Sequence, residues 1–253
     1  MRLAINTFIL VLLAFNPVNA EDRFPTQRSS ELQWGLGLGA LIEDEGYRNI
    51  GSETNGTPVL YVSNDYFRFF ANQFDVSIYG TEQFSLSGKA ESRMDGFSPD
   101  DNAYYAGMEE RDGAIFAGFR GEYKTDAGNL VAEWVTDVTG DSNGSYGSLG
   151  AYWHVDRGAS QLVPKVAVEY YDSDYTDYYY GVRAGEARSD RPAYIADAVF
   201  NLDLGVDFIY RFNRHHQLIS SAKYRRFGSS VTDSPLVDKS GSARFVVGYL
   251  YVF

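Results

Sequence analysis

The side chains best suited to acid–base or metal chemistry are few in this sequence, and they stand apart from one another. There are three histidines and no cysteine; His215 and His216 are adjacent, and His154 is isolated. A hydrolytic triad needs a histidine beside its nucleophile and a third group that orients the ring, and zinc needs several His, Cys or carboxylate ligands at short spacings. The sequence shows neither pattern around the three histidines. We therefore expect a protein that is not an enzyme and that holds no transition metal or cofactor.

Carboxylates gather in four stretches, namely EDE at 43–45, SPDDN at 98–102, EERD at 109–112 and YYDSDYTDYYYG at 170–181. Carboxylate oxygens are ligands for calcium, so a calcium site is one interpretation. However, the segment DSDYTD lacks the glycine and the closing glutamate of an EF-hand loop. Solvated acidic loops are the favoured interpretation.

The first twenty residues predict a secretory signal peptide. Arg2 supplies the positive charge, residues 9–15 form a short apolar run, and Val18 and Ala20 are small residues at the expected cleavage positions. The run is shorter than the ~18 residues that a spanning helix needs. We expect export through the Sec pathway, cleavage after Ala20, and one domain over residues 21–253. A net charge of −12 without a basic patch argues against nucleic acid as a partner.

The elements that must position the charged residues are predicted to be strands. In FNLDLGVDFIYRF, residues 200–212, every even position is apolar or aromatic, while Asp203, Asp207 and Arg211 stand at odd positions. Alternation with period two places the two sets on opposite faces of a strand. The same alternation recurs in residues 32–42, 113–124, 130–137, 149–156 and 163–171.

Aromatic residues indicate that these strands lie in a membrane. The chain has 20 Tyr, 17 Phe and 25 Gly, and the apolar faces end in aromatic residues, as the interface girdles of outer-membrane barrels do. The final stretch FVVGYLYVF ends on Phe253 and resembles the C-terminal signal that the barrel assembly machinery recognises. We predict an all-β, antiparallel, up-and-down barrel in the bacterial outer membrane, in contact with lipid and lipopolysaccharide.

Turn lengths predict the topology. Short turns fall at 63–65, 79–83, 126–129, 157–160 and 214–216, and longer connections at 43–56, 98–112, 140–146, 174–194 and 229–241. Short turns face the periplasm in such barrels, so both termini are expected there and the strand number must be even. We predict twelve strands if 66–71 and 74–79 are two short strands. Ten is the alternative if 57–79 is arranged differently.

Charged residues of both signs are predicted to face the lumen. Isolated charges are costly in a narrow interior, so they should pair across strands and leave a plugged barrel; a selective pore is the alternative. The predicted lumen network comprises Arg120, Glu122, Glu133, Asp137, Lys165, Glu169, Asp203, Asp207, Arg211, Lys223, Arg225 and Arg244.

Several stretches together resemble the MipA/OmpV family. QWGLGLGALIEDEGYRNIG followed by PVLYVSNDYFRFF resembles the family's N-terminal hairpin. DYYYGVRAGEARSDRPAY and SSVTDSPLVDKS resemble two of its loops. The resemblance spans nearly all of the mature chain. It implies an outer-membrane scaffold that links a lytic transglycosylase, which degrades murein, to a penicillin-binding murein synthase in peptidoglycan remodelling. Other members are described as surface antigens or adhesins.

Two functions of different kinds follow. A periplasmic scaffold would offer its partner the N-terminal segment 21–30 and the short turns. The turn residues expected at that contact are Asn64, Asp65, Glu82, Asp126, Arg157, Arg214, His215 and His216. The alternative is a surface antigen, an adhesin or a narrow channel whose acidic loops face outward.

The polar loop before the last strand is predicted to form a lid. It contains Asp233, Ser234, Pro235, Leu236, Val237, Asp238 and Lys239. We expect an Asx-type turn at Asp233 and Ser234, with the proline fixing the bend. Leu236 and Val237 should fold back over the barrel mouth, and Asp238 and Lys239 should pair with lumen charges.

Overall fold

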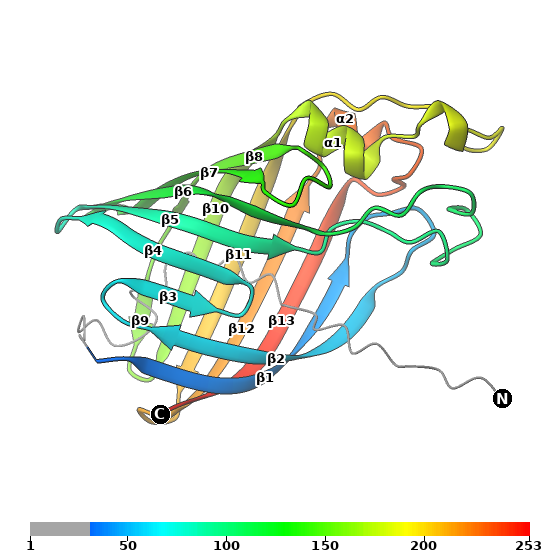
Figure 1. Ribbon diagram of the computed structural model, residues 1–253. Helices are drawn as coiled ribbons and strands as arrows, with labels where there is room; N and C mark the ends of the chain where they lie inside the picture. The colour runs from blue at the N-terminus through cyan, green and yellow to red at the C-terminus, as the bar shows by residue number, and fades with distance from the viewer. Residues whose placement is uncertain (1–30) are drawn as a thin grey trace, which may run out of the picture.

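The computed structural model describes residues 31–253, which form one antiparallel sheet closed into a barrel (Figure 1). The expected signal peptide, its cleavage site and the segment 21–30 lie outside the described residues. The strands are β1 (Gln33–Asp44), β2 (Glu53–Ser63), β3 (Phe67–Phe70), β4 (Gln73–Gly80), β5 (Phe84–Arg93), β6 (Ala114–Thr125), β7 (Gly128–Asp137), β8 (Ser145–Tyr152), β9 (Val155–Arg157), β10 (Ser160–Tyr171), β11 (Val199–Arg211), β12 (His216–Arg226) and β13 (Gly241–Val252). The helices are α1 (Ser173–Tyr180), the 3-10 helix η1 (Ala184–Glu186) and α2 (Ser229–Thr232).

Pairing of the first strand with the last closes the barrel. β1 runs antiparallel to β13, with Gly35 opposite Val252 and Leu41 opposite Val246. β8 and β9 both pair with β10 and form one strand that is interrupted at Trp153 and His154. The thirteen segments therefore make twelve strands. The prediction of twelve strands is confirmed, including the two short strands β3 and β4 on which it depended.

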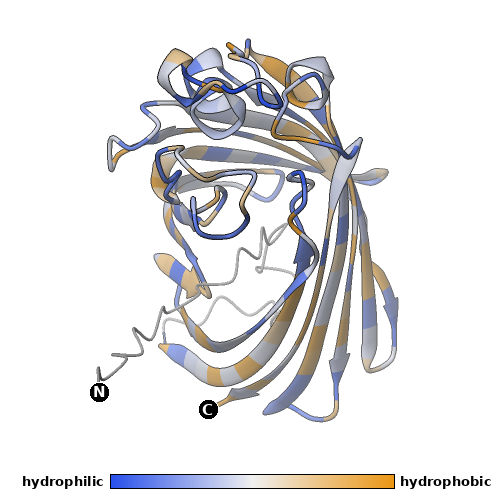
Figure 2. Cartoon of the chain, turned by 90° about the vertical axis from the view of Figure 1, so that its right-hand side faces the viewer, coloured by the Kyte–Doolittle hydropathy of each residue, from blue (hydrophilic) through white to orange (hydrophobic). Residues whose placement is uncertain are grey.

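Side chains alternate between the lumen and the outer surface along each strand. In β11, Asn201, Asp203 and Asp207 are buried, while Phe200 and Leu204 are exposed on the outside. Figure 2 shows the resulting bands of hydrophobic and hydrophilic residues along the strands. An outward apolar band is the surface that lipid requires. Among the described residues, none of the helices is long and apolar enough to cross a membrane.

The two ends of the barrel differ. The long loops, α1 and α2 lie at one end, and the short turns lie with the C-terminus at the other (Figure 1). The Phe253 ring stacks on Trp34 with ring centroids 3.8 Å apart, so the last residue packs against the beginning of β1. Because short turns face the periplasm in outer-membrane barrels, we assign this end to the periplasm.

The acidic stretch after β10 contains a helix where the sequence suggested only a loop. The Asp172 side chain accepts a hydrogen bond from the Tyr175 backbone N–H at 2.9 Å and caps α1. Tyr175 and Tyr179 are four residues apart and therefore share one face of the helix, which is buried. Packing of these rings under the loops explains why a sequence of modest helix propensity becomes helical here.

Candidate functional site

Toward the loop end of the lumen, charged side chains neutralise one another in a buried ion network centred on Arg225. Its guanidinium donates to both Asp203 oxygens, at 2.8 and 2.9 Å, and to Glu169. Lys223 lies 2.7 Å from Asp203 and 3.4 Å from Glu169. The Tyr171 hydroxyl donates to Glu169 at 2.9 Å. Charges from three adjacent strands are thus compensated within the wall.

A second network lies deeper in the lumen and joins β5, β6 and β7. Glu133 accepts hydrogen bonds from Lys89 at 2.9 Å and from Arg120 at 3.2 Å. Arg120 also approaches Glu122 at 3.8 Å, and Lys89 approaches Glu91 at 3.0 Å. All five side chains are almost fully buried. Removing one member of such a network leaves the other buried charges without compensation, which destabilises the fold.

The remaining predicted lumen residues have separate positions. Lys165 and Asp207 form an ion pair at 2.7 Å, and Arg244 pairs with Glu43. The guanidinium of Arg211 donates to Gln161 at 3.5 Å.

Asp137 was expected in the lumen network, but it joins none of the ion pairs described above. Its carboxylate, at the end of β7, accepts hydrogen bonds from backbone N–H groups of Thr139, Gly140, Ser142 and Asn143 and so fixes the following loop.

Sequence reasoning missed the charged residues of β5, namely Lys89, Glu91 and Arg93. Arg93 lies 2.9 Å from Asp95 and 3.9 Å from Glu169, so it connects to the Arg225 network. The outward neighbours in β5 are Gly, Ala and Ser rather than large apolar residues. Alternation of charged with small residues was the available signal, and it is weaker than alternation with aromatic residues.

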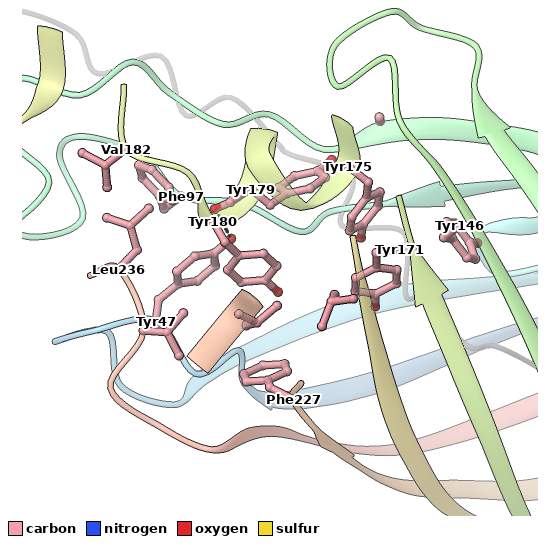
Figure 3. Packing of buried hydrophobic residues seen from close by; sticks show 14 of the residues in the cluster. Tyr47, Phe97, Tyr146, Tyr171, Tyr175, Tyr179, Tyr180, Val182, Phe227 and Leu236 are labelled. Atoms are coloured by element: carbon pink, nitrogen blue, oxygen red, sulfur yellow. Dashed lines mark hydrogen bonds between the residues drawn. The ribbon is translucent and has the colours of Figure 1, made fainter. Parts of the chain in front are cut away.

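Four loops meet over the lumen and form a cluster that we call the plug (Figure 3). Its buried residues include Tyr47, Phe97, Tyr105, Met108, Tyr175, Tyr179, Tyr180, Val182, Phe227, Val231, Leu236 and Val237. The rings of Tyr175 and Tyr179 are 4.8 Å apart, and those of Phe97 and Tyr105 are 4.6 Å apart. Aromatic contacts of this kind add to the free energy of apolar burial, so the outer mouth is packed like a core.

Hydrogen bonds and ion pairs tie the loops of the plug together. The Tyr105 hydroxyl donates to the Arg48 carbonyl at 2.9 Å, and the Arg48 N–H donates to the Leu236 carbonyl at 2.7 Å. Arg111 lies 2.9 Å from Glu186. Burial opposes ionisation of Glu186, but backbone N–H donors and Arg111 hold its pKa below its usual range.

The loop 229–241 contributes to the plug. Leu236 and Val237 are buried in it, and the Ser234 hydroxyl donates to the Tyr180 carbonyl at 2.6 Å. The turn at the start of this segment differs from the expectation. Ser234, not Asp233, makes the side-chain turn, by accepting from the Leu236 N–H at 3.1 Å, because Asp233 closes α2.

The charges of the same loop also differ from the expectation. Asp238 is exposed, and Lys239 pairs with Asp44 at 2.8 Å at the end of β1 rather than with the lumen network. Pro235 is half-buried and offers its carbonyl to the Arg48 side chain at 2.8 Å.

The predicted contact residues lie in the short turns. Glu82, Asp126, Arg157 and Arg214 are exposed, while Asn64, Asp65, His215 and His216 are half-buried. A cleft of about 180 Å³ lies beside the β2–β3 and β4–β5 turns. Asn64, Asp65 and Arg68 line it together with residues of β4 and β5. Of the predicted set, only Asn64 and Asp65 line this cleft.

The histidines serve the same end of the barrel. The Nδ1 atom of His215 lies 2.7 Å from the Val252 carbonyl, and its ring stacks on Tyr251. His154 packs edge-on against Tyr152, with ring centroids 5.2 Å apart. Within residues 31–253, no group of three or more His or carboxylate side chains is arranged to hold a metal ion.

Comparisons with known proteins agree with this architecture. The family model described as MltA-interacting protein MipA matches residues 36–253. The chain is 30% identical to the putative outer membrane protein YiaT of Escherichia coli, over 89% of this chain and 92% of that one. It is 23% identical to the MltA-interacting protein of Escherichia coli, over 88% and 92%. Among solved structures, the translocator domain of the autotransporter NalP from Neisseria meningitidis matches with a TM-score of 0.50 and 10% identity, over 91% of each chain, which is a likeness of fold alone.

Proposed function

Because the chain belongs to the MipA family of outer-membrane barrel proteins, we propose that it is a non-catalytic barrel that holds a lytic transglycosylase at the periplasmic face of the outer membrane. The name of its relative, MltA-interacting protein, supports a murein enzyme as the partner. A penicillin-binding murein synthase is the second partner that the family resemblance implies, so that the barrel would join murein degradation to synthesis.

The observation that carries this proposal is the periplasmic cleft beside the β2–β3 and β4–β5 turns. It brings the polar side chains Asn64, Asp65 and Arg68 together, and Tyr66, which is 73% exposed, belongs to the same turn. Protein contacts concentrate their binding energy in Tyr, Trp and Arg residues that become buried near the centre of the interface. The opposite end is filled by the plug, which weighs against the alternative of an open channel.

Replacement of Tyr66 tests the contact. We expect Tyr66→Ala to weaken binding of the purified lytic transglycosylase to the barrel in nanodiscs by about ten-fold or more, which corresponds to ~1.4 kcal/mol. Phe212→Ala is the matched control, because Phe212 is an exposed aromatic residue of another periplasmic turn. Equal affinities of the two variants and the unaltered barrel would remove the cleft as the contact. Failure of the unaltered barrel to bind the transglycosylase at all would overturn the proposed function.

Phe253 is proposed to contribute to assembly rather than to scaffolding. Its side chain is 54% exposed at the end of the closing strand. We propose that the barrel assembly machinery recognises it, so Phe253→Ala should lower the amount of folded barrel in the membrane. The affinity of the folded fraction for the transglycosylase should stay unchanged.

A further inference from the structure

The β3–β4 hairpin is much shorter than the strands beside it. β2 pairs with β3 only over Tyr61–Ser63, although β2 continues along β1 up to Glu53. Within residues 31–253, no strand pairs with Glu53–Val59 on the side of β2 that faces away from β1. Figure 1 shows the hairpin ending short of the loop end that β2 and β5 approach. We call the gap between β2 and the end of β5, on the loop side of Ala71, the lateral opening.

The edge of β2 that no described strand covers lies at the depth of the lipid-facing surface. Pro58 stands opposite Leu38 of β1 and Gly56 stands opposite Ala40. Leu38 is 72% exposed on the outside of the barrel. Lipid cannot satisfy backbone N–H and C=O groups, and each one left unpaired there costs several kcal/mol. The Pro58 carbonyl accepts from the Thr57 hydroxyl at 3.3 Å. Water or a polar partner must therefore reach the rest of this edge.

The sequence of the edge is adapted to the missing neighbour. The Leu60 carbonyl accepts from the Ala71 N–H at 3.0 Å, so alternate residues further along β2, Pro58 and Gly56, turn their backbone groups toward the opening. Proline has no N–H to leave unpaired and is confined to strand edges in sheets. A Cβ added to Gly56 would meet no atom within 4 Å. Pro58 therefore leaves no N–H without a partner at this edge, and space beside Gly56 is open.

A cavity of about 230 Å³ lies directly behind the lateral opening. Carboxylates of Glu43, Glu45, Glu53 and Asp101 line it. Leu41, Ile50 and Met94 supply its apolar lining. Among its described lining residues the one cation is Arg244, which is paired with Glu43. The cavity therefore has an excess of negative charge beside an apolar wall.

This cavity leads toward the lumen. Glu43, Glu45 and Arg244 also line a second cavity of about 40 Å³ below the plug. Arg244 and Lys223 are shared by that cavity and a third one of about 100 Å³ in the deeper lumen. The shared residues indicate that the three spaces adjoin one another. The outer mouth, by contrast, is filled by the plug.

We propose that the lateral opening admits an amphiphile with a cationic head group from the outer leaflet, its head between the carboxylates of the cavity and its tail against the outer surface of the barrel. The open edge supplies hydrogen-bonding groups, the charge of the cavity favours a cation, and exposed Met94 and Leu60 flank the opening on the lipid side. This inference does not depend on the periplasmic function proposed above.

Titration with dodecyltrimethylammonium tests the chemical class. The barrel in nanodiscs of neutral lipid is titrated by calorimetry, and the heat from empty nanodiscs is subtracted. We expect saturable binding of dodecyltrimethylammonium, and binding at least about ten-fold weaker both for dodecyl sulfate, which has the same tail, and for tetramethylammonium, which has the same head. Equal affinity for dodecyl sulfate would overturn the cationic specificity, and no saturable binding would overturn the proposal.

A pair of glycine variants tests the location. Gly51 lines the cavity and Gly185 lies in η1, and a Cβ at either position would meet no atom within 4 Å. Gly51→Trp should fill the opening and weaken dodecyltrimethylammonium binding by about ten-fold, while Gly185→Trp should bind as the unaltered barrel does. As a second variant, insertion of two residues on each side of the Ala71–Asn72 turn should lengthen the hairpin and close the opening. Unchanged binding in a folded Gly51→Trp variant or a folded hairpin variant would refute the location.

Discussion

The wall formed by β10 to β13 and the wall formed by β2 to β5 are built differently. β10 pairs with β11 along its whole length, from Ser160 to Tyr171, and β12 pairs with β13 over eleven residues. By contrast, β2 and β3 share three residue pairs and β3 and β4 share four. The continuous wall carries the Arg225 network on its inner face. The short wall carries the lateral opening and has the cleft at its periplasmic end.

This difference shows that closure of a barrel need not be uniform around its circumference. Long backbone ladders fix one wall, buried ion pairs occur in both walls, and the plug fixes the outer mouth, so the opposite wall can tolerate a short hairpin. The weaker wall is also the part where polar cavities approach the outer surface. We therefore assign the stability of the barrel mainly to the wall β10 to β13, and access to its interior mainly to the wall β2 to β5.

The largest effect is expected from removing the centre of the ion network in the continuous wall. Arg225→Met leaves Asp203 and Glu169 without their main cation, and breaking a buried pair in this way costs about 3–5 kcal/mol. The midpoint of heat-induced unfolding, followed by gel migration, should fall strongly. Arg226→Met is the matched control, because Arg226 is the exposed neighbour on the same strand and should shift the midpoint little. Equal shifts would mean that the network does not hold this wall.

An intermediate effect is expected from the plug. Replacing Leu236 and Val237 by Ser removes two buried apolar side chains, each worth about 1.5–3 kcal/mol of transfer free energy. The loops should then part, with greater ion leakage across a planar bilayer and faster proteolysis of the loops, while the strands stay folded. Unchanged leakage together with unchanged protease resistance would contradict the sealing role of the plug.

The smallest effect is expected at Glu45, beside the lateral opening. Burial, and then the neighbouring Glu43 carboxylate, raise the pKa of Glu45 well above its usual value. Asp95 and Glu53 act in the same direction and Arg244 in the opposite one. Because the folded state binds this proton more tightly, unaltered barrel loses stability as pH rises from the ordinary glutamate pKa to the raised one.

Glu45→Gln should therefore match the unaltered barrel at pH 4 and exceed it at pH 8. The gain in unfolding midpoint is expected to be about 2–4 °C for each kcal/mol of the difference. The unfolding midpoint measured across this pH range decides the point. If Glu45→Gln raises the unfolding midpoint equally at both pH values, ionisation of Glu45 does not destabilise the folded barrel.

Much of the architecture could be predicted because lipid imposes a period of two on large apolar residues. Asp203, Asp207 and Glu169 alternate with such residues and were assigned to the lumen. Lys89, Glu91 and Arg93 alternate with small residues, so the same reasoning passed over them. The fold of α1 and the turn at Ser234 depend on packing between loops that are far apart in the sequence. Local propensity does not contain that information.

The lateral opening was not predicted at all, although both of its causes are present in the sequence. The short strands before and after Ala71 were expected, and Pro58 is visible in β2. What the sequence does not show is how far β2 and β5 extend beyond the hairpin, because that depends on the register of every strand pair around the barrel.

The central claim is that the cavity behind the lateral opening is reached from the side of the barrel, while the outer mouth is sealed. Thiol labelling can measure this access, because the chain has no cysteine of its own. Leu41→Cys places a thiol in the cavity behind the opening, and Val231→Cys places one inside the plug. We predict that a cationic methanethiosulfonate reagent modifies the thiol of Leu41→Cys readily and the thiol of Val231→Cys slowly. Adding Gly51→Trp should slow modification of Leu41→Cys by roughly ten-fold, because the reagent loses access to the cavity. Modification of Leu41→Cys at the same rate with and without Gly51→Trp would contradict the account.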